Sequence, residues 1–197
     1  MSENPLQNLI PRKLSYAALV RSGWAGFTRA SIVNSFQLDG MLSEAIAACE
    51  GKIMGQQAEF SHSMLYLGRG QLLDQQLKLE VRSLENYVGS ILRVYQNPLF
   101  SQAQLNTIVA ESMVWHGTKY DFRIIGAHAA ETMLGTDGLA ELVHDPDRFD
   151  CSEGVCTFVR YGDTQFMDGR PCQVMPEEID EWCIQAGWRI NTYALVE

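Results

Sequence analysis

The longest regular pattern of apolar residues in the chain runs from Gln71 to Tyr95. Its apolar side chains recur at steps of three and four, the spacing that forms one stripe along an α-helix. The residues of this stripe are Leu73, Leu77, Val81, Leu84, Val88, Ile91, Leu92 and Tyr95. A Gly68-Arg69-Gly70 segment precedes the pattern and Asn97-Pro98 follows it, so both ends carry stop signals. The pattern predicts one long helix over about residues 71–96.

A second long pattern with helical spacing precedes that one, over residues 41–67. Its apolar positions are Leu42, Ile46, Cys49, Ile53, Phe60, Met64 and Leu67. Only four residues, Leu67 to Gly70, would join the two helices, and a short connection places helices side by side in opposite directions. The two patterns together predict a long antiparallel αα-hairpin.

Shorter helices are expected on both sides of this hairpin. Residues 14–36 read as one broken helix or two short ones, because Gly23 and Gly26 interrupt the pattern. The helices expected after the hairpin cover 102–114, capped by Ser101, then 122–134, capped by Asp121, and 139–143. The helical part of the chain would therefore end near residue 143.

The residue pattern changes at His144, where an acidic loop with a proline leads to residue 150. Beyond it we expect a strand over 155–161, a returning strand over 164–167, a helix over 176–186 and a last strand over 188–196.

The fold class expected from these elements is α+β and mainly α. It is a helical bundle built on the hairpin of about 41–67 and 71–96, with a small C-terminal β-hairpin, helix and strand. The expected domains are a disordered arm over 1–13, the bundle over 14–143 and an acidic α/β segment over 144–197, packed on the bundle.

The composition predicts a cytoplasmic protein with a sizeable core. Hydrophobic residues make up 46% of the 197 residues, which is ordinary for a globular chain. The sequence has no run of 18 apolar residues, and its first residues are polar, so we expect neither membrane association nor a signal peptide. In a reducing compartment the five cysteines would be thiols rather than disulfides.

The formal net charge of −9 is concentrated in the second half of the chain. Residues 1–100 carry nine Lys and Arg against eight Asp and Glu, and residues 101–197 carry six against sixteen, which sum to 15 and 24. Phosphate binding needs a basic surface, so direct nucleic-acid binding is not expected. The acidic half would suit a basic protein partner, and mimicry of nucleic acid toward such a partner is a minor alternative.

Our first functional hypothesis is therefore a soluble interaction or regulatory protein. It would bind a protein partner through its acidic half and its helical surface, and a homodimer is an alternative assembly. The expected binding residues are Asp145, Asp147, Asp150, Glu177, Glu178 and Glu181.

A second hypothesis is an enzyme, and its sharpest motif is Trp115-His116-Gly117-Thr118. This motif resembles the His-Gly-Ser/Thr of ADP-ribosyltransferases of the diphtheria-toxin type. The resemblance implies that His116 meets the adenosine ribose of NAD, with Tyr161 and one of Glu177, Glu178 and Glu181 as later partners. The same four residues also suit a helix end, with Gly117 in a left-handed conformation. His116 is the catalytic candidate only if the protein is an enzyme.

The other enzyme alternative is a Cys/His hydrolase. The nucleophile candidates are Cys49, Cys151, Cys156, Cys172 and Cys183, and the base candidates are His116, His128 and His144. Such pairs are neighbours in space rather than in sequence, so the sequence leaves the choice among them open.

No cofactor and no metal are expected. The sequence has no phosphate-binding glycine loop. The Glu59-to-His62 spacing occurs once, where a di-iron bundle needs two such pairs, and His128 with Glu131 has the reverse order. Cys151, Cys156, Cys172 and Cys183 lack a C-x2-C pair, and whether they bind zinc stays open.

Overall fold

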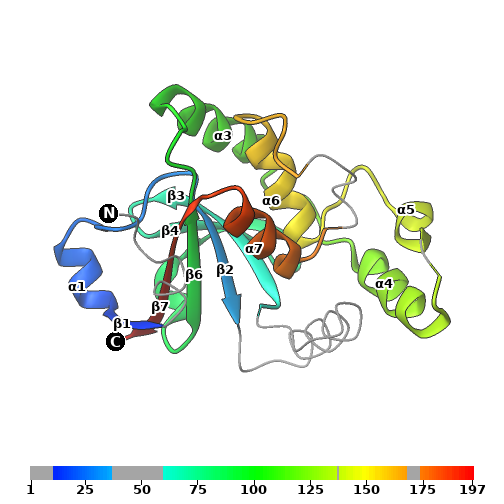
Figure 1. Cartoon of the computed structure of the whole chain (residues 1–197), viewed down its shortest axis with the longest axis horizontal. Coiled ribbons are helices and arrows are strands. Elements are labelled where there is room, and N and C mark those ends of the chain that lie inside the picture. Colours follow the sequence, from blue (N-terminus) through cyan, green and yellow to red (C-terminus); the bar gives the residue numbers. More distant parts are fainter. Residues whose placement is uncertain (1–10, 37–59, 137, 168–173) are drawn as a thin grey trace.

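A mixed seven-stranded sheet organises the protein, as seen in a computed structural model that describes residues 11–36, 60–136, 138–167 and 174–197. The strands are β1 (Arg12–Ser15), β2 (Ile32–Phe36), β3 (His62–Gly68), β4 (Gln71–Gln75), β5 (Leu79–Ser83), β6 (Ile91–Gln96) and β7 (Arg189–Val196). Their order is β1-β7-β6-β2-β3-β4-β5 (Figure 1). β1 pairs parallel to β7, and every other neighbouring pair is antiparallel.

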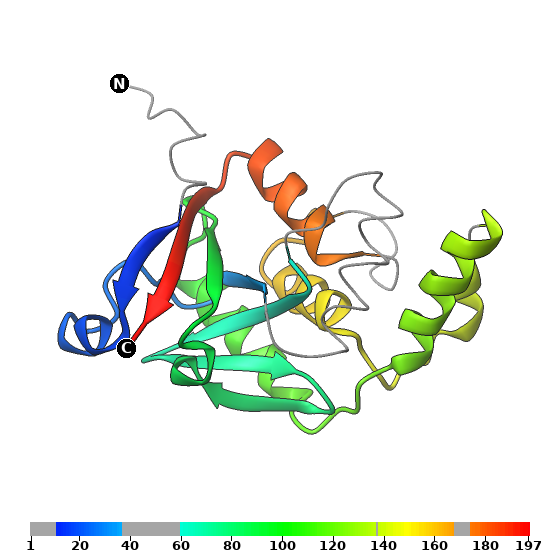
Figure 2. The same cartoon turned by 90° about the horizontal axis from the view of Figure 1, so that it is seen from below.

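The helices lie around this sheet. They are α1 (Tyr16–Arg21), α3 (Gln102–Val114), α4 (Phe122–Leu134), α5 (Leu139–Val143), α6 (Cys151–Arg160) and α7 (Pro176–Gln185), with a 3-10 turn, η2, at Leu84–Tyr87. Figures 1 and 2 show α4 and α5 side by side, projecting away from the sheet. None of the helices in the described segments is long and apolar enough to cross a membrane.

The predicted helical bundle is wrong, and the long hairpin is the main error. Residues 71–96 form β4, β5, η2 and β6, and residues 62–68 form β3, while the rest of the predicted 41–67 helix up to residue 59 lies outside the described residues. Four of the five residues of β4 are buried, so both faces of the strand are covered and the alternation that identifies a strand is lost. Leu77, a member of the predicted stripe, is 72% exposed in the turn between β4 and β5.

Two positions with positive φ make the tight turn that replaces the predicted link between helices. Gly68 pairs with Gln71, which leaves Arg69 and Gly70 as the turn, at φ 53° and 73°. Backbone of this kind follows the right-handed twist of a hairpin. The glycine-rich segment that was predicted to connect two helices is therefore the turn of the hairpin between β3 and β4.

Other segments divide between confirmed and wrong predictions. The helices expected over 102–114, 122–134 and 139–143 are confirmed, as are the helix that begins at Pro176 and the last strand. Residues 14–36 contain a strand at each end and one short helix, rather than helices throughout. The strand predicted over 155–161 is wrong because residues 155–160 belong to α6 and Tyr161 is its C-cap, and the predicted returning strand at 164–167 is a turn.

Alternating side chains of the strands enter two separate cores. One core lies between the sheet and the helices α3, α6 and α7, and it includes Ile32, Leu65 and Tyr95. The other core lies against α1 and η2, and it includes Val33 and Met64 from the same strands. Because successive strand residues point to opposite faces, β2 and β3 supply both cores at once.

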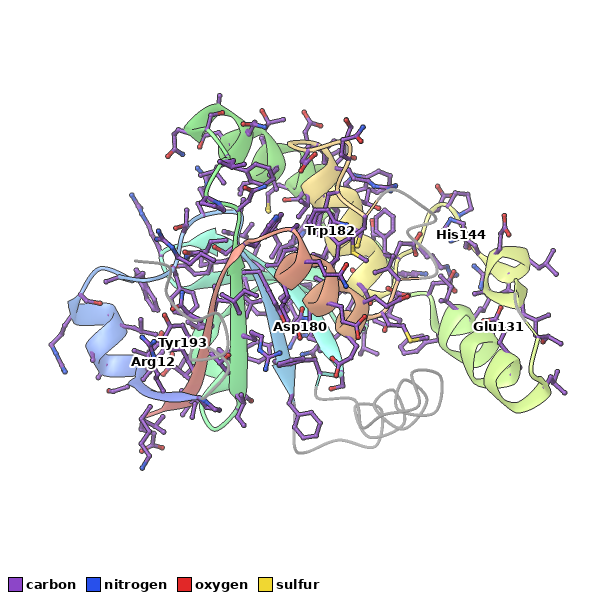
Figure 3. All side chains as sticks on the ribbon, in the orientation of Figure 1. Arg12, Glu131, His144, Asp180, Trp182 and Tyr193 are labelled. Carbon is purple, nitrogen blue, oxygen red and sulfur yellow. The ribbon has the colours of Figure 1, made fainter. Side chains whose placement is uncertain are left out.

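A buried polar cluster fixes α7 to the first of these faces. Arg93 Nη1 lies 2.7 Å from Asp180 Oδ2, and the Tyr95 hydroxyl donates to Asp180 Oδ1 at 2.7 Å. Asn34 Nδ2 donates to the carbonyl oxygen of Pro176 at 2.8 Å. Figure 3 shows Asp180 on the side of α7 that faces the strands. These bonds set the position of the helix against β2 and β6.

We expect Gly70→Ala to destabilise the protein by about 2–5 kcal/mol, because it combines left-handed strain with overpacking. A Cβ at Gly70 would overlap the indole ring of Trp24. Gly89→Ala is the matched control, since Gly89 has φ +96° with no atom within 4 Å of an added Cβ, and should cost about 1–2 kcal/mol. Urea unfolding of both variants measures the difference, and equal losses would contradict the prediction.

Candidate active site

A cysteine, a histidine and an aspartate meet where the start of α6 lies against β3 and β4. Cys151 is the first residue of α6, His62 begins β3, and Asp74 lies near the end of β4. Asp74 pairs with Met64 across the β3 and β4 ladder, so His62 is its diagonal neighbour two residues along. All three side chains are buried.

The His62 and Asp74 side chains form the short contact at the centre of the site. His62 Nε2 lies 2.6 Å from Asp74 Oδ1. Cys151 also lies near His62, close enough for its charge to act on the imidazole. One imidazole thus has a carboxylate and a thiol as neighbours.

The charges around His62 favour its protonated form. Burial lowers the pKa of His62, but the negative charges and hydrogen bonds of Asp74 and Cys151 outweigh burial and raise this pKa from 6.5 to about 10. An imidazolium beside a thiol favours the thiolate, which is the nucleophilic form of cysteine.

Asp74 remains ionised although water does not reach it. Burial raises the pKa of the Asp74 carboxyl, but the charge and hydrogen bond of His62, the hydroxyl of Tyr87 and the charge of Arg82 together hold it below its usual value. The Tyr87 hydroxyl donates to Oδ2 at 2.6 Å, and Arg82 Nε lies 3.3 Å from the same oxygen. The carboxylate therefore has a fixed partner at each oxygen.

The start of α6 places Cys151 in an electrostatically favourable position. Asp150 caps the helix, and its Oδ1 accepts from the backbone N–H of Glu153 at 2.7 Å. The first turn of a helix carries the positive end of its dipole, which stabilises an anion there. Cys151 is the first residue of this turn.

Tyr120, in the loop before α4, contacts Cys151. Its hydroxyl donates to Cys151 Sγ at 4.0 Å. Burial, followed by the nearby Cys151 and Asp150, raises the pKa of Tyr120 well above its usual value, so its proton stays on the hydroxyl. Tyr120 therefore offers a neutral hydrogen-bond donor beside the sulfur.

Glu153 is a buried acid in the first turn of α6. Burial, with added repulsion from Asp150 and then Asp121, raises the pKa of Glu153 to about 9. His144, which follows α5 (Figure 3), has its Nδ1 3.5 Å from Glu153 Oε1. Glu153 is therefore neutral near neutral pH. It adds no negative charge beside Cys151.

The predicted acidic binding residues occupy different environments. Asp145 pairs with Arg123 and Arg148, Asp147 is exposed, and Asp150 is the cap of α6. In α7, Glu177 is buried, Glu178 accepts from the N–H of Met175, and Glu181 is exposed.

The His-Gly motif lies at the end of a helix. α3 leads into it, His116 is exposed, and Gly117 has φ 92°. The N–H of Gly117 donates to the carbonyl oxygen of Leu79 at 2.8 Å. A helix, rather than the strand that the resemblance implies, therefore precedes His116.

Of the thiols named as nucleophile candidates, the structure brings Cys151 to a histidine. Cys156 and Cys183 are buried in the core under α6 and α7, and Cys49 and Cys172 lie outside the described residues. Glu59 and the His128 side chain are also outside them. Within the described ranges, no group of three or more His, Cys, Asp or Glu residues is arranged to hold a metal ion.

Sequence reasoning missed His62, Asp74 and Tyr120 as site residues. His62 and Asp74 were assigned to helices that are strands, which separated them from each other and from Cys151. A usable signal was the pair Asp150 and Glu153, whose spacing favours a helix that begins at Cys151.

No protein-family model matches this chain, and no curated protein shows significant sequence similarity to it.

The His62 charge network predicts how stability depends on pH. The pKa of His62 is higher in the folded chain than in the unfolded chain. His62 therefore stabilises the fold fully below pH 6.5, and this contribution is lost as the pH rises toward about 10. Urea unfolding across this range should show His62→Gln losing less stability than the wild type, by about 2–4 kcal/mol.

His116→Gln is the control for this experiment, because His116 is exposed and is not among the groups that act on His62 or Asp74. Its stability should follow the wild-type pH dependence. Parallel curves for His62→Gln and the wild type would contradict the assigned role of His62.

Proposed function

We propose that the protein is a cysteine hydrolase that cleaves an acyl bond through a covalent thioester at Cys151. The observation that carries the proposal is the contiguous arrangement of Cys151, His62 and Asp74, with the thiol on the first turn of α6. A thiol, a base and a group that orients the base recur on unrelated folds as the machinery of acyl transfer. Free thiols at Cys151, Cys156 and Cys183 suit a reducing compartment.

The first half of the reaction uses the pair of Cys151 and His62. The thiolate sulfur attacks the substrate carbonyl carbon, and the carbonyl oxygen becomes an oxyanion. The imidazolium of His62 then gives its proton to the leaving group as the bond to that group breaks. Asp74 holds the ring in the orientation for this transfer. The products of this half are the thioester and the protonated leaving group.

The second half returns the enzyme to its starting state. Neutral His62 takes a proton from a water molecule, whose oxygen attacks the thioester carbonyl. The carbon–sulfur bond breaks, which releases a carboxylic acid and restores the thiolate beside the imidazolium.

Tyr120 and the N–H of Cys151 are our candidates for stabilising the oxyanion. Both groups lie beside the sulfur, where the carbonyl oxygen would develop its charge. A single donor of this kind is worth about 10²–10³-fold in rate. A donor fixed in a buried site also needs little reorganisation during the reaction.

We expect 4-nitrophenyl acetate to acetylate Cys151 selectively, because this thiol alone among the described cysteines contacts a histidine. Intact-protein and peptide mass spectrometry should show one acetyl group at Cys151, with a burst of nitrophenolate. His62→Gln should slow the burst by about 10²–10⁴-fold, and Cys151→Ala should abolish it. Cys156→Ala, which removes a buried thiol from the same helix, should retain it.

Acetylation spread evenly over the cysteines, or a burst that survives in Cys151→Ala, would overturn the proposal. Circular dichroism of each variant shows whether a loss of reactivity comes with a loss of folding.

A further inference from the structure

We infer that Tyr87 is a positioning residue that holds Asp74 for its work on His62, acting through the carboxylate without touching the reacting atoms. The inference rests on the proposed function and deepens it. It assigns to the reaction a residue from η2, which lies outside the three elements that carry Cys151, His62 and Asp74.

Geometry supports this role because the two oxygens of Asp74 have separate partners. Oδ1 lies 2.6 Å from His62 Nε2, and the Tyr87 hydroxyl donates to Oδ2 at 2.6 Å. A carboxylate fixed at both oxygens cannot rotate about its last bond without breaking one of these contacts. Tyr87 thereby keeps Oδ1 directed at the imidazole.

The other cation at Asp74 cannot replace this hydroxyl. Arg82 Nε lies 3.3 Å from Oδ2, but the same nitrogen makes no geometrically acceptable hydrogen bond to the described residues. Arg82 also faces Glu80, at 3.5 Å from its Nη2, and its side chain is 31% exposed. Arg82 supplies positive charge near Asp74, whereas the hydrogen bond from Tyr87 fixes the orientation of the carboxylate.

The tyrosine itself is fixed from several sides. Tyr87 is 1% exposed and packs in the core between the sheet and α1. Gln76 Nε2 donates to its hydroxyl oxygen at 3.4 Å, so the hydroxyl proton is directed to Asp74. Ser83 caps η2 through the N–H of Glu85, which fixes the turn that presents the ring.

The groups that face Asp74 determine what loss of the hydroxyl should do. They are His62 from β3, Arg82 from β5 and Tyr87 from η2. Without the Tyr87 donor, burial acts more strongly on the carboxylate, which then takes up a proton more easily. Once Asp74 is neutral, His62 loses the anion that stabilises its charged form. As the pH is lowered, the pair of thiolate and imidazolium should then be lost at a higher pH than in the wild type.

The experiment measures alkylation of Cys151 by iodoacetamide as a function of pH, followed by peptide mass spectrometry. Tyr87→Phe should shift the acidic limb of the profile upward by about one pH unit, with a rate within about twofold of wild type on the alkaline side. Tyr66→Phe is the matched control, because Tyr66 is buried in the same core and its hydroxyl accepts from the N–H of Gly70. Its profile should superimpose on that of the wild type.

Arg82→Gln provides a second variant in case Tyr87→Phe folds poorly. It removes charge from a partly exposed position and should shift the acidic limb in the same direction by a smaller amount. A Tyr87→Phe profile that superimposes on the wild type, or an equal shift in Tyr66→Phe, overturns the role of Tyr87. Wild-type Cys151 that alkylates no faster than Cys156 at any pH overturns the proposed function and this inference with it.

Discussion

A buried, ionised carboxylate at Asp74 is the constraint on which the candidate site depends. A carboxylate without water is costly unless donors and positive charge surround it. Here His62, Tyr87 and Arg82 come from β3, η2 and β5, so the charge is stabilised only when these segments assemble around β4. The charge network can therefore form only together with the sheet, because no single helix or strand carries all of its members.

The thiol reaches this network because a helix begins at the right residue. Asp150 ends the preceding loop and caps α6, which leaves Cys151 on the first turn, where the helix dipole favours an anion. Further along α6, Val155, Cys156, Phe158 and Val159 enter the core beneath the sheet. The same helix thus combines a body packed in the core, which fixes its axis, with a first turn that places Cys151 beside His62.

The helices of this protein were largely predictable from local signals, and the sheet was not. Ser101 and Asp121 cap α3 and α4 through their own side chains, and Pro176 opens α7, so these boundaries depend on near neighbours in sequence. The central strands depend instead on long-range pairing and are buried on both faces, which removes their alternation.

The same distinction explains which site residues the sequence indicated. Cys151 was one of five candidate thiols, but His62 and Asp74 acquire meaning only through the register of β3 and β4. A distance of 2.6 Å between their side chains follows from a pairing that no local pattern encodes. Charge composition pointed instead to six acidic residues, because composition reports the amount of charge and not which carboxylate is buried beside a base.

The projecting pair of α4 and α5 does not disturb this geometry, because its two ends are fastened together at the sheet. Tyr120 precedes the pair and Phe149 follows it, and these residues form a parallel bridge. The N–H of Asp121 donates to the carbonyl oxygen of Phe149 at 2.9 Å, and the Gln75 side chain donates to the same oxygen at 3.3 Å. Asp121 Oδ2 accepts from the N–H of Asp145 at 3.2 Å. Motion of the two helices would therefore not pass beyond the bridge between Tyr120 and Phe149. The chain that carries Tyr120 and Cys151 would stay attached to the end of β4.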